Sequence, residues 1–214
     1  MQYRHLLILF VMVVMVNIGV FAQDSMSDSL HSMTVPVETF PPSPDARVIE
    51  DASATLVSSE SGIFTHVSTN ELEEGHVYTM WVVIINNPAA CAASPCMPAE
   101  ILGNSDALQS DGVWGDSILY NGDGHMEFTS YTPAGDLPDS WFDNGLIDPV
   151  GAEIHIIIHD LGESIPDMAS TMLNSFRGGC TDASLPPPFP DTAKSNGEAG
   201  PNTCKLVQDA IWVQ

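Results

Sequence analysis

The run from His76 to Ile85, HVYTMWVVII, is built almost entirely of β-branched and aromatic residues and contains neither glycine nor proline. Such residues favour extended backbone, and the nearly continuous apolar character indicates a central strand that is buried on both faces. The Asn-Asn-Pro sequence that follows is typical of a turn and ends the run. The segment therefore predicts a β-sheet around which the rest of the chain is arranged.

Shorter runs of the same kind follow one another along the chain, separated by turn residues. ATLVSSE and GIFTHVS form a hairpin pattern, and DSILY and HMEFTSY are joined by NGDG, a sequence suited to a tight turn. AEIHIIIHD and CKLVQDAIWVQ supply two more strands. About seven short strands predict an all-β domain, an antiparallel β-sandwich or barrel. One short helix is predicted in IPDMASTMLNSFRGG, with Pro166 in its first turn and Gly178 after its end.

The first 22 residues predict an export signal that is cleaved near Ala22. Arg4 and His5 form a basic start, an apolar run extends from Leu6 to Val16, and small residues precede the polar QDSMSDS, as in secretory signals. The alternative is an uncleaved membrane anchor, because the apolar run is long for a signal, but the small residues at its end favour cleavage. The mature chain is therefore expected to be secreted or periplasmic.

Residues 23–46 are rich in serine and proline and show no apolar period, so we expect a flexible leader before a folded domain at 47–214. The chain has 28 acidic and 5 basic residues, a formal net charge of −23. Such a surface repels nucleic acid and anionic membranes. The acidity is consistent with divalent-cation binding or with life in saline water, where salt screens the repulsion, and composition does not separate the two.

The four cysteines of an exported chain predict two disulfides. Pairing neighbours gives Cys91–Cys96 and Cys180–Cys204, which is one of three connectivities that the sequence allows. Loop-closure entropy would contribute ~2 kcal/mol for the short bridge and ~3.5 kcal/mol for the long one. A metal site is the alternative, but the cysteines lack the paired spacing of zinc sites.

The segment GAEIHIIIHD at 151–160 places two histidines and a glutamate in an apolar strand. Alternate side chains of a strand share a face, so Ile154 belongs to a core face and the opposite face carries Glu153, His155, Ile157 and His159. His155 and His159 lie ~13 Å apart, whereas Glu153 and His155 lie ~6.6 Å apart and could share an ion with a neighbouring strand. The favoured alternative is a half-exposed face whose polar side chains are solvated.

The motifs GHVYTMWVVIINNPAAC, GLIDPVGAEIHIIIHD, FRGGC and Cys-x-x-Val-Gln-x-Ala resemble an uncharacterised family of exported bacterial single-domain proteins. That family has four cysteines, an Asn-Asn-Pro-x-x-Cys turn and a GAEIH strand motif, and the likeness extends from Thr55 to Val213. It implies export and the β domain but no activity. An arginine often stands there in place of His159, which counts against a metal role for His159, whereas His155 matches the pattern.

Histidines are the main candidates for enzyme chemistry. The sequence has no G-x-S-x-G, P-loop, dinucleotide-binding glycine motif or H-E-x-x-H. Imidazoles from several strands can bind copper or zinc. The candidate metal ligands are therefore His155 and Glu153 with another strand histidine, either His76 or His125.

Two further ligand classes fit the loops. Calcium takes carboxylate, amide and carbonyl oxygens, which this chain offers at Asp111, Asp116, Asn121, Asp123, Asp143, Asn144 and Asp148; ordinary turn chemistry is the favoured alternative. Trp114 and Trp141, in predicted loops, form with Asp143 and Asp148 a candidate ligand-binding patch for a carbohydrate, although loop aromatics also cover core edges.

The sequence thus predicts a secreted, disulfide-stabilised β domain with a binding or structural role outside the cytoplasm. A cell-surface or matrix ligand is the candidate partner, and calcium, copper or zinc the candidate cofactor. The alternative is a metal-dependent exported enzyme that uses His155 with another strand histidine.

Overall fold

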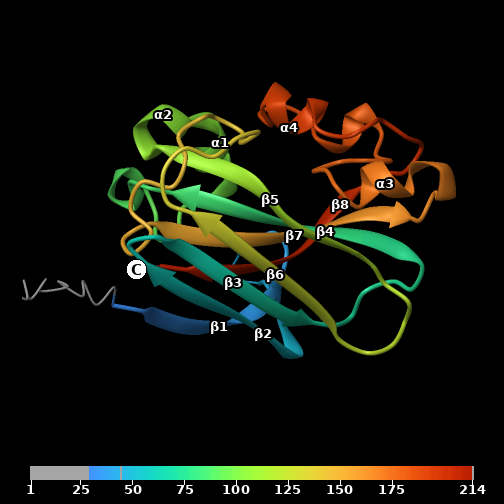
Figure 1. The fold of residues 1–214 in the computed structure, drawn as a ribbon, viewed down its shortest axis with the longest axis horizontal. Coiled ribbons are helices and arrows are strands. Elements are labelled where there is room, and N and C mark those ends of the chain that lie inside the picture. Colours follow the sequence, from blue (N-terminus) through green and yellow to red (C-terminus); the bar gives the residue numbers. More distant parts are fainter. Residues whose placement is uncertain (1–28, 44, 214) are drawn as a thin grey trace, which may run out of the picture.

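The computed structural model describes residues 29–43 and 45–213, which form one eight-stranded antiparallel sheet that curls into a nearly closed barrel (Figure 1). The predicted signal peptide at 1–22 lies outside the described residues. None of the helices among the described residues has the length and hydropathy that a membrane crossing requires. The strands, in chain order, are β1 His31–Thr39, β2 Val48–Ser59, β3 Gly62–Thr69, β4 His76–Ile85, β5 Ser110–Leu119, β6 Met126–Pro133, β7 Glu153–Glu163 and β8 Lys205–Trp212.

Sheet order departs from chain order, because β7 and β8 lie between β4 and β1. Neighbouring strands follow the sequence β5-β4-β7-β8-β1-β2-β3-β6. The two outermost strands, β5 and β6, approach each other, and the Asp116 carboxylate of β5 accepts a hydrogen bond from the Thr129 amide of β6 at 2.9 Å. The predicted all-β class is confirmed, with a barrel-like sheet rather than two separate sheets.

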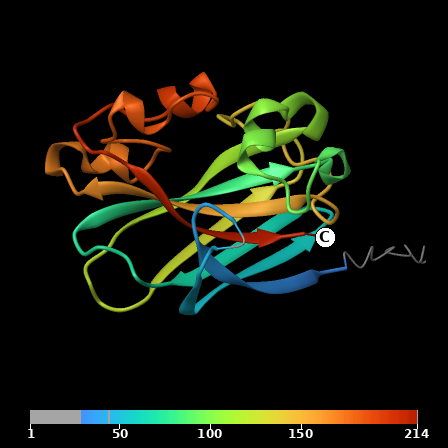
Figure 2. The ribbon, with the colours of Figure 1, turned by 180° about the vertical axis from the view of Figure 1, so that it is seen from behind.

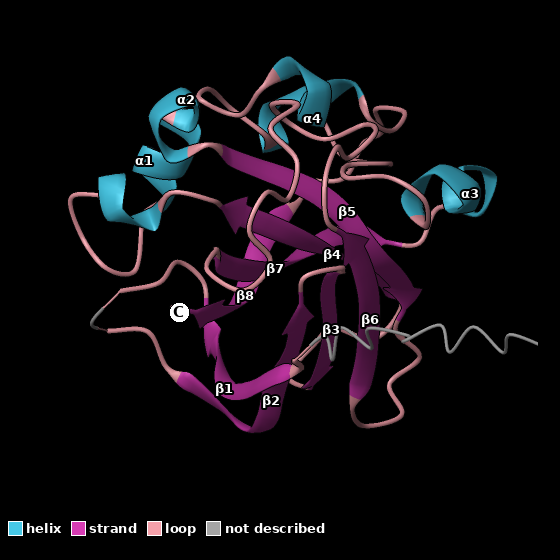
Figure 3. Ribbon diagram, turned by 60° about the vertical axis from the view of Figure 1, so that its left-hand side comes forward, coloured by secondary structure: helices cyan, strands magenta, loops and turns pink. Residues whose placement is uncertain are grey.

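The barrel interior is the main hydrophobic core. It holds inward-facing side chains from most strands, including Leu56 of β2, Phe128 of β6 and Trp212 of β8. β4 and β7 are buried on both faces, as predicted for β4. Their outer faces are covered by loops and by short helices, namely α1 Pro98–Gly103, α2 Ser105–Leu108, α3 Ala169–Met172 and α4 Asp191–Ser195. Figure 2 shows these helices on one side of the barrel, and Figure 3 shows β1, β2 and β3 on the opposite side.

The prediction that His155 and its neighbours form a solvated strand face is wrong. Glu153, His155 and His159 are at most 2% exposed. The covering layer over β4 and β7 forms a second core around Trp81, Trp141 and similar side chains. The layer consists of segments distant in sequence, so the local alternation of polar and apolar residues could not reveal it.

The expected flexible leader is wrong for its central part. β1, His31–Thr39, pairs with β2 along most of its length and with β8 at its end. Most of its side chains are exposed, and Val37 is the residue it buries deeply. Backbone hydrogen bonds, rather than an apolar face, hold this strand in the sheet. Its sequence can therefore be polar.

The predicted helix at 165–179 is confirmed only in its first part. A short 3-10 helix, Pro166–Met168, runs into α3, which ends at Met172. The chain then turns back, and the backbone of Gly178 packs so closely on the Thr171 carbonyl that a Cβ would lie 2.4 Å from the oxygen. Gly178 and Gly179 were expected to end a long helix. They lie instead in a later turn where the backbone packs closely.

Both predicted disulfides are formed. Cys91 pairs with Cys96, and Cys180 pairs with Cys204. The first closes a loop in the covering layer, and the second anchors the long segment that leads into β8. Two disulfides are typical of proteins in an oxidising, extracytoplasmic environment.

Candidate functional site

The ladder between β1 and β8 is the shortest of the sheet. Glu38 and Thr39 of β1 pair with Asp209 and Gln208 of β8, and the Phe40 amide that follows donates to the Val207 carbonyl at 2.9 Å. On the other side of Glu38 the pairing stops. Pro36 has no N–H with which to extend the ladder. A row of paired positions is thus replaced by an opening in the barrel wall.

Trp212 of β8, next to this opening, is fully buried in the barrel core. Its Nε1 donates a hydrogen bond to the Met33 carbonyl of β1 at 3.1 Å, across the gap. One indole thus spans the place where backbone pairing is missing. The outer part of the gap remains open as a pocket.

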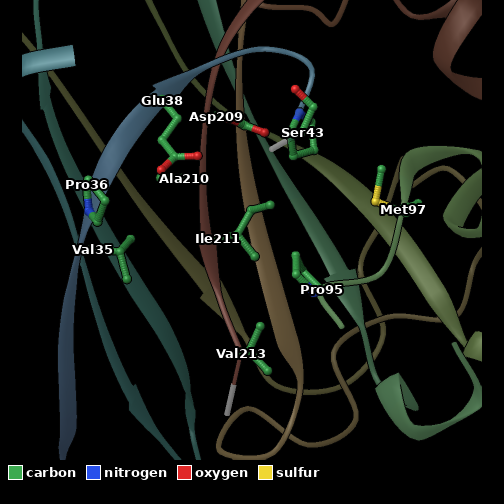
Figure 4. A pocket seen from close by; sticks show the side chains of 11 residues that line it. Val35, Pro36, Glu38, Ser43, Pro95, Met97, Asp209, Ala210, Ile211 and Val213 are labelled. Atoms are coloured by element: carbon green, nitrogen blue, oxygen red, sulfur yellow. The ribbon is translucent and has the colours of Figure 1, made fainter. Parts of the chain in front are cut away.

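We call this opening the seam pocket; its volume is about 490 Å³, which is in the range of small-molecule sites. β1 contributes Val35, Pro36 and Glu38, and β8 contributes Asp209 to Ile211 and the adjoining Val213. Loop residues close the sides, namely Pro42, Ser43, Pro95 and Met97. Figure 4 shows the carboxyl groups of Glu38 and Asp209 toward one end and the side chain of Val213 toward the other.

Asp209 is the distinctive polar group of the seam pocket. Its side chain is 2% exposed, and its Oδ2 atom has no hydrogen-bond partner among the described residues. Burial, and secondly the nearby Glu38 carboxylate, raise the pKa of Asp209 to about 7. An unpartnered buried carboxyl is costly, so a ligand that brings a donor or a positive charge to Oδ2 would gain a desolvated partner.

The predicted metal ligands do not gather at one point. Glu153 and His155 are adjacent, with His155 Nε2 2.6 Å from Glu153 Oε1, and the same oxygen accepts the Cys96 amide at 2.7 Å. His76 lies opposite Glu163 on β7, whereas His155 lies opposite Val83 of β4, so the two histidines are about 23 Å apart along the strands. The expected convergence of His155 with His76 is therefore wrong.

The remaining histidines have other surroundings. His76 Nδ1 contacts Asp160 Oδ1 at 2.9 Å, at the end of the barrel where Lys205 also approaches Asp160. His125 is exposed in the turn before β6. In the described part of the chain, one group of three potential ligands lies within 4.8 Å, and it consists of His159, Cys180 and Cys204. Neither His125 nor His76 joins His155.

The candidate aromatic patch is not formed. Trp141 is 4% exposed and packs edge-on against Trp81, with ring centroids 5.4 Å apart. Its ring lies over Gly112 of β5, where a Cβ would approach it to 2.3 Å. Trp114 lies on β5, not in a loop, and is 37% exposed, with Nε1 donating to Ser117 at 2.9 Å. The glycine opposite Trp141 explains why that ring could sink into the covering layer.

The two aspartates of the candidate patch, Asp143 and Asp148, lie in turns or face solvent. Asp148 Oδ1 accepts the amides of Val150 and Gly151 at 3.2 and 3.0 Å, which is an Asx-type turn. Asp143 is exposed and has a positive φ of 59°. Both residues lie near the loop that carries Trp141, but without an exposed ring beside them they do not build the expected ligand surface.

Turn chemistry also occupies carboxylates considered for calcium. Asp111 is fully buried and accepts the amides of Gly112, Phe142 and Gly145 at 2.7–3.0 Å. Asp123 Oδ2 accepts from the side chain of Asn121 at 2.9 Å. The two Asp111 oxygens thus satisfy backbone donors and hold the loop around residue 142 against β5.

No protein-family model, curated protein or solved structure matches this chain significantly. The seam pocket was missed by the sequence reasoning. The available signal was Asp209 in KLVQDAIWVQ, a carboxylate in an otherwise largely apolar strand. The role of Asp209 depends on the gap between β1 and β8. That gap exists only because β1 is a strand, which the sequence did not predict.

Proposed function

We propose that the protein is an extracytoplasmic binding domain whose ligand is a small organic cation with an apolar body. The carrying observation is Asp209, a buried carboxyl whose Oδ2 has no hydrogen-bond partner among the described residues, in a largely apolar pocket of about 490 Å³. An ammonium group placed at Asp209 and Glu38 would offset the cost of keeping two carboxyls together. Its hydrocarbon part would lie against Val35, Ile211 and Val213.

Electrostatics favours a cation over a neutral or anionic ligand. The formal net charge of −23 attracts cations and repels anions at long range. A metal ion fits the pocket less well, because calcium requires six to eight oxygens and the carboxyl-bearing lining residues are Glu38 and Asp209. The apolar walls would leave most of its coordination unsatisfied.

Isothermal titration with three ligands of equal chain length tests the proposal, namely octylammonium, octanol and octanoate. We expect octylammonium to bind best to the wild-type protein. Asp209→Asn should reduce octylammonium affinity by about tenfold or more, since a buried charged hydrogen bond is worth ~1.5–3 kcal/mol, and should leave octanol binding nearly unchanged. Asp106→Asn removes the same charge from an exposed site and is the matched control. Equal affinities for the three ligands would reject the proposal.

We also infer that the chain is exported, as the basic and apolar segment at 1–22 and the resemblance to exported bacterial proteins suggest. The two disulfides support an oxidising compartment. N-terminal sequencing of the protein recovered from a bacterial expression host tests this inference. A mature terminus near Gln23 is expected, and an intact Met1 on membrane-bound protein would support the anchor instead.

A further inference from the structure

His159 has a buried ring nitrogen without a hydrogen-bond partner among the described residues. The side chain is fully buried, and its Nδ1 lies 3.1 Å from the Phe176 carbonyl oxygen. A carbonyl oxygen only accepts hydrogen bonds, so Nδ1 carries the proton and Nε2 of the neutral ring keeps its lone pair. That Nε2 has no partner among the described residues. Burial supports the neutral form, because it lowers the pKa of His159 to about 4.

Two sulfur atoms lie beside this imidazole. One ligand atom of His159 and the sulfurs of Cys180 and Cys204 lie within 4.8 Å of one another, and all three residues are buried. The two sulfurs are joined in a disulfide, so they are not thiolates in this state. A tetrahedral zinc site has metal–ligand distances of about 2.0–2.3 Å, so small movements of the separated sulfurs would bring all three groups to one ion.

We propose that reduction of the Cys180–Cys204 disulfide creates a buried metal site for a thiophilic cation, zinc(II) or copper(I), with His159 as the third ligand. A dithiol reductant supplies two electrons and two protons, the S–S bond breaks, and the reductant becomes a disulfide. The metal then displaces the two thiol protons to solvent. The bare Nε2 of His159 donates its lone pair to the metal.

The surrounding structure suits such a site. The Nδ1–Phe176 hydrogen bond holds the ring, as hydrogen bonds from the second nitrogen do for metal-binding histidines. Cys204 immediately precedes β8, and the two cysteines bracket a segment with a sequence separation of 24, so reduction removes the covalent closure of this segment. No histidine, aspartate or glutamate in the described structure forms such a group with Cys91 and Cys96, so that bridge is an internal control.

The test is a cobalt(II) titration of the full mature chain under argon, with and without prior reduction, followed by absorbance and circular dichroism. We expect the reduced protein to bind one cobalt per chain with thiolate charge-transfer bands and the visible bands of tetrahedral cobalt. The oxidised protein should show neither. Zinc should displace cobalt, and competition with a copper(I)-specific chelator distinguishes the two biological candidates. Where reduction loosens the chain, metal addition should restore the β-sheet signal.

Three variants separate this site from unspecific thiol binding. Cys91→Ser combined with Cys96→Ser should retain the spectrum, whereas Cys180→Ser combined with Cys204→Ser should abolish it. His159→Phe keeps an aromatic ring against Trp81 and should weaken cobalt binding by at least the roughly 10–100-fold that loss of an outer-shell partner costs. Absence of metal uptake by the reduced wild type, or equal affinity and spectrum in His159→Phe, would overturn the proposal.

Discussion

Glu38 of β1 and Asp209 of β8 lie directly opposite each other at the last paired position before the two strands separate. Directly opposed side chains of an antiparallel pair have Cβ atoms about 4.5–5.5 Å apart, and like charges there are destabilising. The barrel therefore places two carboxyls together where its wall opens. This pair gives the seam pocket its chemical character, and it makes protonation of Asp209 part of the protein's stability.

Asp209 should make the protein less stable as the pH rises. Its pKa is about 7 in the folded state against a reference of 3.8, so between these values the folded state holds a proton that the unfolded chain releases. This contribution to stability is full below about pH 4 and declines by up to about 1.4 kcal/mol per pH unit until about pH 7. Urea unfolding of Asp209→Asn at pH 5 and 7 should show stability increasing with pH relative to wild type. Parallel curves would contradict the assignment.

His159 should have the opposite pH dependence. Its pKa is about 4 when folded against 6.5 for the reference, so the unfolded chain binds a proton that the folded protein excludes. Its contribution is full above about pH 6.5 and is lost toward pH 4, which is nearly the window of Asp209. The two slopes oppose each other in the wild type, and His159→Phe should reveal the falling slope of Asp209 in the same unfolding experiment. A His159→Phe variant whose stability between pH 5 and 7 changes in the same way as that of wild type would contradict this prediction.

The contact between β5 and β6, the two outermost strands of the sheet, should depend on Asp116. One carboxylate oxygen accepts the Thr129 amide and the other the Ser117 amide, at 2.9 and 2.8 Å. Asp116→Ala removes both acceptors and should lower the free energy of unfolding by about 1–3 kcal/mol. Hydrogen exchange should accelerate at the Thr129 amide more than at the buried amides of β4. Asp123→Ala, in the exposed turn before β6, is the control and should change stability little. Unchanged exchange at Thr129 would show that the carboxylate does not close the barrel.

Reduction of the long disulfide should loosen β8 before β4. β8 pairs with β7 along its length but with β1 at two positions, whereas β4 has full ladders on both sides. The double variant Cys180→Ser, Cys204→Ser should lower the free energy of unfolding by up to ~3.5 kcal/mol. The double variant Cys91→Ser, Cys96→Ser should lower it by ~2 kcal/mol. Hydrogen exchange followed by mass spectrometry should show early exposure of peptides from 205–212. Simultaneous exposure of β4 and β8 would contradict this order.

Local sequence patterns were sufficient to predict the elements whose own residues indicate their structure. The β-branched run of β4 predicts a doubly buried strand, and neighbour pairing of the cysteines predicts both disulfides. β1 escaped prediction because backbone pairing holds it while most of its side chains stay exposed. Its polar composition is the same as that of a flexible segment, so only the available partner strands distinguish the two.

The sites depended on contacts between distant segments. Trp141 reads as a loop aromatic, and it is buried because Gly112, far away in the chain, leaves room for its ring. The strand pattern and the family resemblance give His159 no metal role, but the fold places the sulfurs of Cys180 and Cys204 beside its ring. Asp209 acquires its raised pKa from burial beside Glu38. Residue type alone identified none of these three environments.

The pKa of the Asp209 carboxyl, measured by carbon-13 NMR with and without saturating octylammonium, tests the proposed binding function most directly. The structure predicts a value of about 7 in the free protein. A cation that binds at this carboxylate favours its charged form and should lower the pKa by about one unit or more, equivalent to about 1.4 kcal/mol of interaction. An Asp209 titration curve that octylammonium leaves unchanged would contradict the account.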